Sequence, residues 1–450
     1  MGLVRKLLYA PALGKTYRSK ADMSRLLLSE IAKYGNPRSK VLWLTPLRSL
    51  RWREAKDLEI TFNVPRKRIN ILPSKEEAGC HLMRTVYSPI LSLVVCPKCS
   101  NTCWYRYVIK EFLESDSGIW IATHHFLPFA IYGKCNYVVV DEYDALIPDL
   151  LITTVHEDEV KRLIKLGLIT EQTLKKLHKR GMLYKWEHIY WVPMKVYFSE
   201  VALYAKELRL LSATPPPREF EFIITFFNPE DVPEDFVYEF DMKVQIVEEV
   251  IVPKKHKIQG FALVDNVYMK SPKRRELLDE VARLAGRLGG KTTVIVGSKE
   301  ERERLYNAIT RRYPGLKVAR DTRYEYSKLE DAEVRIIVVG GPINRGWNLD
   351  SDYVIAFWQY MRPDEKVKLA QMFVDYIHDV NEWHLIKYIE YRKHVQTLFR
   401  CIRSYDRPHT LLLLDFNYYD VFTMFGRTLS FMKDAIHLAS DLSKAVSNLR

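Results

Sequence analysis

The segment from Tyr9 to Thr16 carries residue types suited to holding a phosphate chain. An apolar run leads into "YAPALGKT", which ends in Gly14, Lys15 and Thr16. Backbone N–H groups at a helix start, a lysine and a hydroxyl are what the β and γ phosphates of a nucleotide and its Mg²⁺ require. The usual pattern has a glycine five positions before Gly14, where this chain has Tyr9. The alternative is an ordinary strand–helix turn with a solvated lysine.

A second chemical feature is the pair of carboxylates in "VVVDEYDAL". Asp141 and Glu142 end a hydrophobic run, so one carboxylate can reach the magnesium ion and the other a hydrolytic water. A charged strand end facing solvent is the simpler interpretation of one acidic pair. A strand with GKT followed by a strand ending in Asp-Glu is the order of a nucleotide hydrolase, and the segment "LLSATPPP", with Ser212, Ala213 and Thr214, makes the simpler interpretation less favoured.

Four of the six cysteines lie within 24 residues, namely Cys80, Cys96, Cys99 and Cys103. Clustered thiols in a reducing compartment indicate a metal site before they indicate disulfides. Four thiolates suit a [4Fe-4S] cluster or tetrahedral zinc, and spacing alone does not separate the two. Cys135 and Cys401 fit better as small core residues.

Composition narrows the classes of partner. The 450 residues are 47% hydrophobic and 28% charged, which is typical of two or three globular domains. The net charge of +13 favours phosphate-rich partners, nucleic acid first. No apolar run is long enough to cross a bilayer, and the N-terminus lacks a signal pattern. We therefore expect a soluble, intracellular protein.

The elements that must position these residues form two α/β series. In the first, "SKVLWLTP", "GIWIAT" and "NYVVVDE" have the composition of buried strands, and a helix ending at Gly35 follows the phosphate loop. In the second, an apolar stripe over 277–288 predicts a helix that Gly289 and Gly290 end. The strands "TTVIVGS", "RIIVVGGP" and "HTLLLLDFN" follow it, and the Pro-rich segment near residue 215 marks the boundary between the two series.

Taken together, GKT, DEYD and SAT resemble the motifs of superfamily two helicases. "VLWLTPLRSL" resembles their motif Ia, which implies nucleic-acid contacts by Thr45, Pro46 and Arg48, and "IATHHFL" resembles the element before the acidic box. That likeness implies further contacts by Thr123 and His124. In the second half, "VIVGS" resembles motif IV. "GGPINRGWNLDSD" resembles motif V, with these residues at its informative positions: Gly346, Asn348 and Asp350.

"VQTLFRCIRSYDRPHTLLLLDFN" is similar to motif VI of the XPD and DinG branch. The matching positions are Gln396, Arg400, Arg403, Asp406 and Asp415. The resemblance implies that Arg400 and Arg403 act as arginine fingers on the γ phosphate and that Gln396 and Asp350 couple the second domain to the nucleotide. Phe399 departs from the usual glycine. The alternative for this segment is a basic amphipathic surface helix.

The four cysteines occupy the place where that branch inserts an iron-sulfur domain, so the resemblance favours iron-sulfur over zinc at residues 78–106. The family also has a large helical arch between the acidic box and the SAT motif. Here we expect only a short helical insertion, at 145–211.

The resulting prediction is an α/β protein with two RecA-like P-loop NTPase domains in tandem, at 1–215 and 216–450. Both insertions lie in the first domain. The resemblance implies an ATP- and Mg²⁺-dependent DNA helicase that moves 5′ to 3′ on single-stranded or forked DNA, and we expect a monomer. Two alternatives remain: a nucleic-acid-binding protein with a decayed motor, and a zinc-containing superfamily two helicase of another branch, viral or CRISPR-associated.

Overall fold

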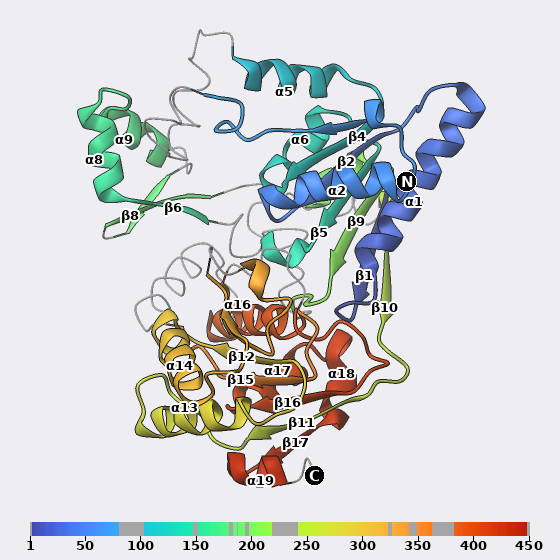
Figure 1. Ribbon diagram of the computed structural model, residues 1–450. Coiled ribbons are helices and arrows are strands. Elements are labelled where there is room, and N and C mark those ends of the chain that lie inside the picture. The colour runs from blue at the N-terminus through green and yellow to red at the C-terminus, as the bar shows by residue number, and fades with distance from the viewer. Residues whose placement is uncertain are drawn as a thin grey trace. The chain divides into compact units, whose positions relative to one another are not determined.

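A computed structural model describes most of the chain (Figure 1). The residues outside its description are 1, 81–102, 147–151, 180–182, 187, 194–197, 218–241, 323–325, 342–348, 362–381 and 448–450. The chain divides into two compact units. The first comprises Met1–Leu7, Thr16–Ser212 and Ile224–Glu248, and the second comprises Leu8–Lys15, Ala213–Ile223 and Glu249–Arg450.

Seven strands form the first sheet, in the order β10-β1-β9-β5-β2-β4-β3. They are β1 (Gly2–Tyr9), β2 (Lys40–Thr45), β3 (Ile69–Ile71), β4 (Gly118–Thr123), β5 (Tyr137–Asp141), β9 (Glu207–Ser212) and β10 (Val244–Ile251). The helices that accompany it are α1 (Lys15–Tyr34), α2 (Arg48–Ile60), α5 (Trp104–Glu114), α6 (Phe129–Tyr132) and α10 (Phe198–Tyr204).

The register of this sheet brings the ends of its central strands to one edge. β2 pairs with β4 in parallel, with Thr45 opposite Thr123, and β5 pairs with β9 in parallel, with Asp141 opposite Leu211. Strands covered on both faces need nearly continuous apolar runs, and every residue of β2 is buried. The carboxyl edge, where ligands bind in such sheets, therefore carries the predicted site residues.

The stretch predicted as a short helical insertion has both helices and a sheet. Helices α8 (Glu157–Lys165) and α9 (Glu171–Lys179) accompany a three-stranded antiparallel sheet of β6 (Ile152–His156), β8 (Ile189–Pro193) and β7 (Tyr184–Trp186). Its strands and helices are drawn together in Figure 1. Its buried residues form a cluster of their own: Val155, Val160, Leu163, Ile169, Leu174, Leu177 and Leu183.

The second unit contains a seven-stranded sheet in the order β13-β14-β12-β15-β16-β11-β17, whose pairings are all parallel. The strands are β11 (Ile258–Leu263), β12 (Thr292–Val296), β13 (Val318–Arg320), β14 (Val334–Val338), β15 (Tyr353–Ala356), β16 (His409–Leu413) and β17 (Ile436–Ala439). The helices include α13 (Pro272–Ala285), α14 (Lys299–Arg312), α16 (Glu382–Leu398), α17 (Asn417–Met424), α18 (Gly426–Ala435) and α19 (Leu442–Ser447).

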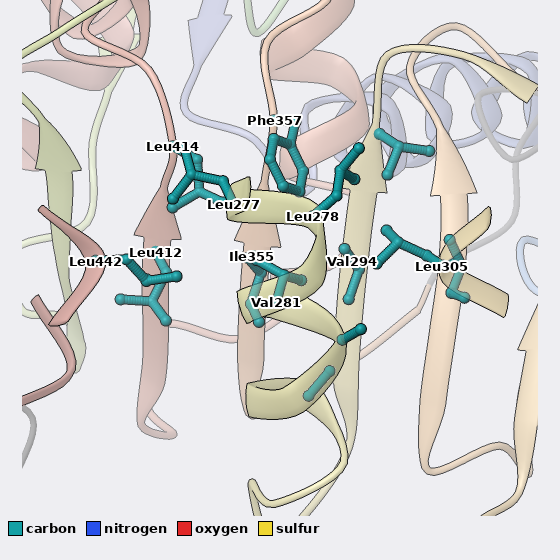
Figure 2. Close-up of a cluster of buried hydrophobic side chains, with 14 of the residues drawn as sticks. Leu277, Leu278, Val281, Val294, Leu305, Ile355, Phe357, Leu412, Leu414 and Leu442 are labelled. Atoms are coloured by element: carbon teal, nitrogen blue, oxygen red, sulfur yellow. The ribbon is translucent and has the colours of Figure 1, made fainter. Parts of the chain in front are cut away.

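The apolar stripe of α13 covers one face of this sheet. Figure 2 shows Leu277, Leu278 and Val281 directed at strand residues such as Val294 and Ile355, all of them buried. The sequence predicted this stripe and its sheet. The helix stops at Ala285 with Gly286 as its C-cap, a turn before the Gly289–Gly290 pair that the sequence suggested.

Among the described residues, no helix has the length and apolarity required to span a membrane.

Candidate functional site

Hydrogen bonds from two tyrosine hydroxyls hold the start of the loop between β1 and α1. Tyr9, at the position where a glycine is usual, is 2% exposed, and its hydroxyl donates to Glu249 Oε1 at 2.8 Å. The Tyr405 hydroxyl donates to the Pro11 carbonyl at 2.6 Å. The turn itself uses left-handed backbone at Ala12 (φ 66°) and Gly14 (φ 77°). The loop thus makes its turn without a glycine at position 9, whereas Gly14 occupies a conformation that favours glycine.

The structure brings Thr16 and Asp141 together across 125 positions of sequence. The Thr16 hydroxyl donates to Asp141 Oδ1 at 3.0 Å and Oδ2 at 3.1 Å, and Asp141 is 7% exposed. Lys15, half-buried, is the first residue of α1, whose N-terminal N–H groups and dipole favour an anion. A hydroxyl and a carboxylate are the oxygen donors that Mg²⁺ takes when it also binds substrate phosphates.

The residues after Asp141 are fixed by two further hydrogen bonds. His124, buried, has Nε2 at 2.7 Å from the Asp141 carbonyl oxygen. The Ser212 hydroxyl donates to Asp144 Oδ1 at 2.7 Å, and both side chains are buried. Glu142 lies between Asp141 and Asp144 with a left-handed backbone (φ 53°). The acidic motif, residues 141–144, is therefore hydrogen-bonded to the end of β9, where the SAT segment begins.

Asp144 is a site residue to which the sequence alone assigns no role. The motifs DEYD and SAT both stand out in the sequence, but the sequence does not show which carboxylate of DEYD accepts the hydrogen bond from Ser212.

The nucleic-acid candidates fall into two groups. Thr45 is fully buried, and its hydroxyl donates to the carbonyl oxygens of Leu47 (3.1 Å) and Ala122 (3.3 Å), so its side chain holds the loop in place. Arg48 is 43% exposed and forms an ion pair with Glu76 at 2.6 Å. Thr123, half-buried at the end of β4, lies opposite Thr45. Pro46 is half-buried as well, so Pro46, Arg48 and Thr123 have accessible surface, whereas Thr45 and His124 are buried.

Two of the four clustered cysteines, Cys96 and Cys99, lie outside the described residues. The other two, Cys80 and Cys103, are half-buried free thiols, and Cys103 is the residue before α5. The part of the chain that the structure describes contains no group of three or more potential metal ligands. The two described thiols do suit a thiolate-bound metal, since neither is sealed in the core.

Cys135 and Cys401 are the two cysteines outside this cluster. Both are buried, and burial raises the pKa of each thiol to about 12. Such thiols stay protonated and unreactive, which agrees with their predicted core role.

In the second unit, the motif VI residues follow α16. Gln396, half-buried, lies in the last turns of the helix, and the half-buried Arg400 and Arg403 come just after it. The Arg400 carbonyl accepts the Leu349 N–H at 2.7 Å. Phe399, which departs from the family pattern, is 3% exposed. Its ring is part of the core, which explains why an aromatic residue is accommodated there.

The motif V residues are only partly described, because Gly346 and Asn348 lie outside the described residues. The Asp350 carboxylate forms an ion pair with Arg407.

Asp415 lies two residues after β16 and organises the loops beside it. Its fully buried carboxylate accepts hydrogen bonds from Val267 N–H (2.7 Å), Tyr360 Oη (2.6 Å) and Asn417 N–H (3.0 Å). Burial raises the pKa of Asp415. With both oxygens engaged inside the unit, this carboxylate supports the fold.

Comparison with known proteins finds similar structures, but no match at the level of sequence. The sequence matches no protein-family model and no curated protein. The fold is similar to that of apo XPD, with a TM-score of 0.56 and 14% identity over 97% of this chain and 97% of that chain. It is also similar to Xpd4 of S. tokodaii, with a TM-score of 0.51 and 13% identity over 97% and 96% of the two chains.

At these identities the likeness concerns the fold alone. It confirms the predicted fold class, an α/β protein with two RecA-like domains in tandem.

Proposed function

We propose that this protein is an ATP-driven motor that moves on nucleic acid, with the chemistry of superfamily two helicases. The observation that carries the proposal is the Thr16–Asp141 hydrogen bond, which joins the GKT loop to the acidic strand end. The fold similarity to XPD agrees with it. Thr16 and Asp141 would hold Mg²⁺, Lys15 the phosphates, and Glu142 the attacking water.

ATP hydrolysis with and without single-stranded DNA tests this function. We expect single-stranded DNA to stimulate hydrolysis, and Lys15→Ala and Glu142→Gln to lower kcat by about 100-fold or more, since each removes a group that acts on the transferred phosphoryl. Lys33→Ala, at the exposed end of the same helix α1, is the matched control. Undiminished hydrolysis in both site variants would contradict the proposal. DNA binding without ATP binding in the wild type would favour the decayed-motor alternative.

Arg400, Arg403, Gln396 and Asp350 extend the proposal to the second unit. Arg400 and Arg403 would neutralise charge on the γ phosphate. We expect Arg400→Ala to lower kcat strongly and to change the KM for ATP less, because a guanidinium of this kind stabilises the transition state. Asp350 is engaged by Arg407 in this structure. Coupling by Asp350 would therefore require that ion pair to open, and Arg407→Ala would alter the DNA stimulation of hydrolysis.

The finer proposal is a DNA helicase with 5′ to 3′ polarity, which rests on the motif VI resemblance. Forked duplexes with a single 5′ or 3′ tail, and matching RNA duplexes, test both the direction and the nucleic acid. Preference for the 3′ tail, or for RNA, would contradict this finer statement and leave the motor proposal intact.

The four cysteines are proposed to hold a [4Fe-4S] cluster, with zinc as the alternative. The sequence places all four within 24 residues, and the two that the structure describes are half-buried free thiols. Protein purified without oxygen should contain about four irons per chain and absorb broadly near about 400 nm. One zinc per colourless chain would leave the motor proposal unchanged and remove the iron-sulfur assignment.

A further inference from the structure

Tyr17, the residue after the GKT motif, has an exposed aromatic ring with one aromatic neighbour at close range. It lies in the first turn of α1, is 60% exposed, and its ring centroid is 5.0 Å from that of Phe62, with the rings inclined at 52°. Exposed single aromatics are ordinary, but this pair lies directly beside the proposed phosphate and magnesium residues.

Phe62 is held in position by the way α2 ends. Asn63 adopts a left-handed conformation (φ 56°), and the Val64 N–H donates to the Leu58 carbonyl at 3.0 Å, six positions back. A left-handed residue thus stops the helix, and this bond ties the apolar residue that follows it back to the last turn of α2. Leu58 and Val64 are both buried. The Phe62 backbone is therefore fixed by the helix stop.

An ion-pair group locks α1 against the same end of α2. The Lys20 ammonium, 6% exposed, donates to Asp57 at 2.8 Å and also pairs with the buried Glu54. Lys20 is three residues after Tyr17, so the two lie on one face of α1. The aromatic pair thus stands on a braced helix–helix contact.

We propose that the Tyr17 ring, braced by Phe62, is the stacking platform for the nucleobase of the bound nucleoside triphosphate. This inference rests on the proposed function, because it assumes that the phosphates lie at Lys15 and Thr16. The sugar and base must extend away from the phosphates, and the residue that follows Thr16 offers the exposed ring of a rigid pair. A base bound by stacking is recognised through its π face, with little need for hydrogen bonds.

The test separates contacts to the base from contacts to the phosphates. Tyr17→Ala should raise the KM for ATP roughly tenfold, the range expected for loss of one base–aromatic stack. The Ki of inorganic tripolyphosphate, which has no base, should stay unchanged. Tyr17→Trp should keep the wild-type KM, and Phe62→Ala should raise it less than Tyr17→Ala. Tyr34→Ala, at the other end of α1 and 42% exposed, is the control and should change neither constant.

An unchanged KM in Tyr17→Ala would overturn the inference, and so would an equal rise in the tripolyphosphate Ki, because the ring would then support the phosphate loop and not the base. If the wild type hydrolyses ATP and Tyr17→Ala does so with the same KM, only this inference fails. If the wild type neither binds nor hydrolyses ATP, the proposed function fails together with it.

Discussion

Arg274 is a fully buried cation in the second unit. It reaches from α13 to Glu301 on α14, with Nε–Oε1 at 2.7 Å and Nη2–Oε2 at 2.9 Å, and it also donates to the Trp358 carbonyl at 2.9 Å. Removing one member of a buried pair leaves the other charge without compensation. We expect Arg274→Met to destabilise the second unit by about 3–5 kcal/mol. Native-state hydrogen exchange of the β12 and β15 amides measures this change.

The same two helices supply a matched control at the surface. Arg304 of α14 pairs with Asp279 of α13 at 3.0 Å, and the two side chains are 43% and 59% exposed. Arg304→Met should cost less than about 1 kcal/mol, as exposed pairs usually do. Equal effects of the two substitutions would show that burial does not set the strength of the Arg274 pair.

His394 makes the second unit sensitive to acid. Its ring stacks on Trp358 with centroids 3.7 Å apart, and Nδ1 lies 3.1 Å from the Tyr418 hydroxyl. Burial lowers the pKa of His394 to about 3, and the nearby Arg274 acts in the same direction. In the unfolded chain His394 binds a proton near pH 6.5, whereas in the folded unit it stays neutral at that pH. Between about pH 6.5 and 3, stability should therefore fall with falling pH, by up to about 1.4 kcal/mol per pH unit from this group.

The slope of stability against pH isolates this contribution. His394→Gln should reduce the slope of unfolding free energy against pH, between about pH 4 and 6, by up to about 1.4 kcal/mol per pH unit. This holds whatever the substitution does to stability at neutral pH. His437→Gln, a histidine substitution at an exposed position on β17, is the matched control. Identical slopes in all three proteins would contradict the assignment.

At the scale of elements, the sequence predicted most of the two parallel sheets. Strands such as β2 and β12 are short apolar runs that are buried along their whole length, and a run of this kind between two helices usually forms a buried strand. The antiparallel sheet of the insertion was not foreseen. One outer strand, β7, has three residues, too few to show a two-residue alternation, and the helices α8 and α9 dominate the composition of that stretch.

The insertion should unfold separately from the sheet that carries the catalytic candidates. Leu163 of α8 is fully buried in the seven-residue cluster of the insertion. Leu163→Ala should cost about 2–5 kcal/mol, enough to open so small a core. We expect faster hydrogen exchange in β6 and β8 and unchanged exchange in β2 and β5. Leu166→Ala, three residues away and 52% exposed, should change neither. Faster exchange in β2 would show that the two cores unfold together.

At the scale of the whole chain, the candidate site was only partly predictable. The pairing of Thr16 with Asp141 followed from motif order, because parallel strands end at one edge of their sheet. That Thr45 would be buried and bonded to backbone did not follow, since a motif match identifies a position and not the direction of its side chain. The Ser212–Asp144 bond likewise depends on strand register, which the apolar pattern leaves open.

The net charge of +13 leads to a prediction about the molecule as a whole. The logarithm of the association constant for single-stranded DNA should fall linearly with the logarithm of the salt concentration. Each neutralised phosphate releases a counterion and contributes about −0.7 to the slope of this line. Arg48, accessible beside Glu76, is the proposed phosphate contact at the edge of the first sheet. Arg48→Ala should make the slope shallower by about 0.7. Arg25→Ala, 79% exposed on α1, should leave the slope unchanged.

Two outcomes would contradict a phosphate contact at Arg48. A slope that is equally reduced in both variants would mean that binding depends on the overall charge and not on a contact at Arg48. An unchanged slope in Arg48→Ala would remove Arg48 from the proposed nucleic-acid site.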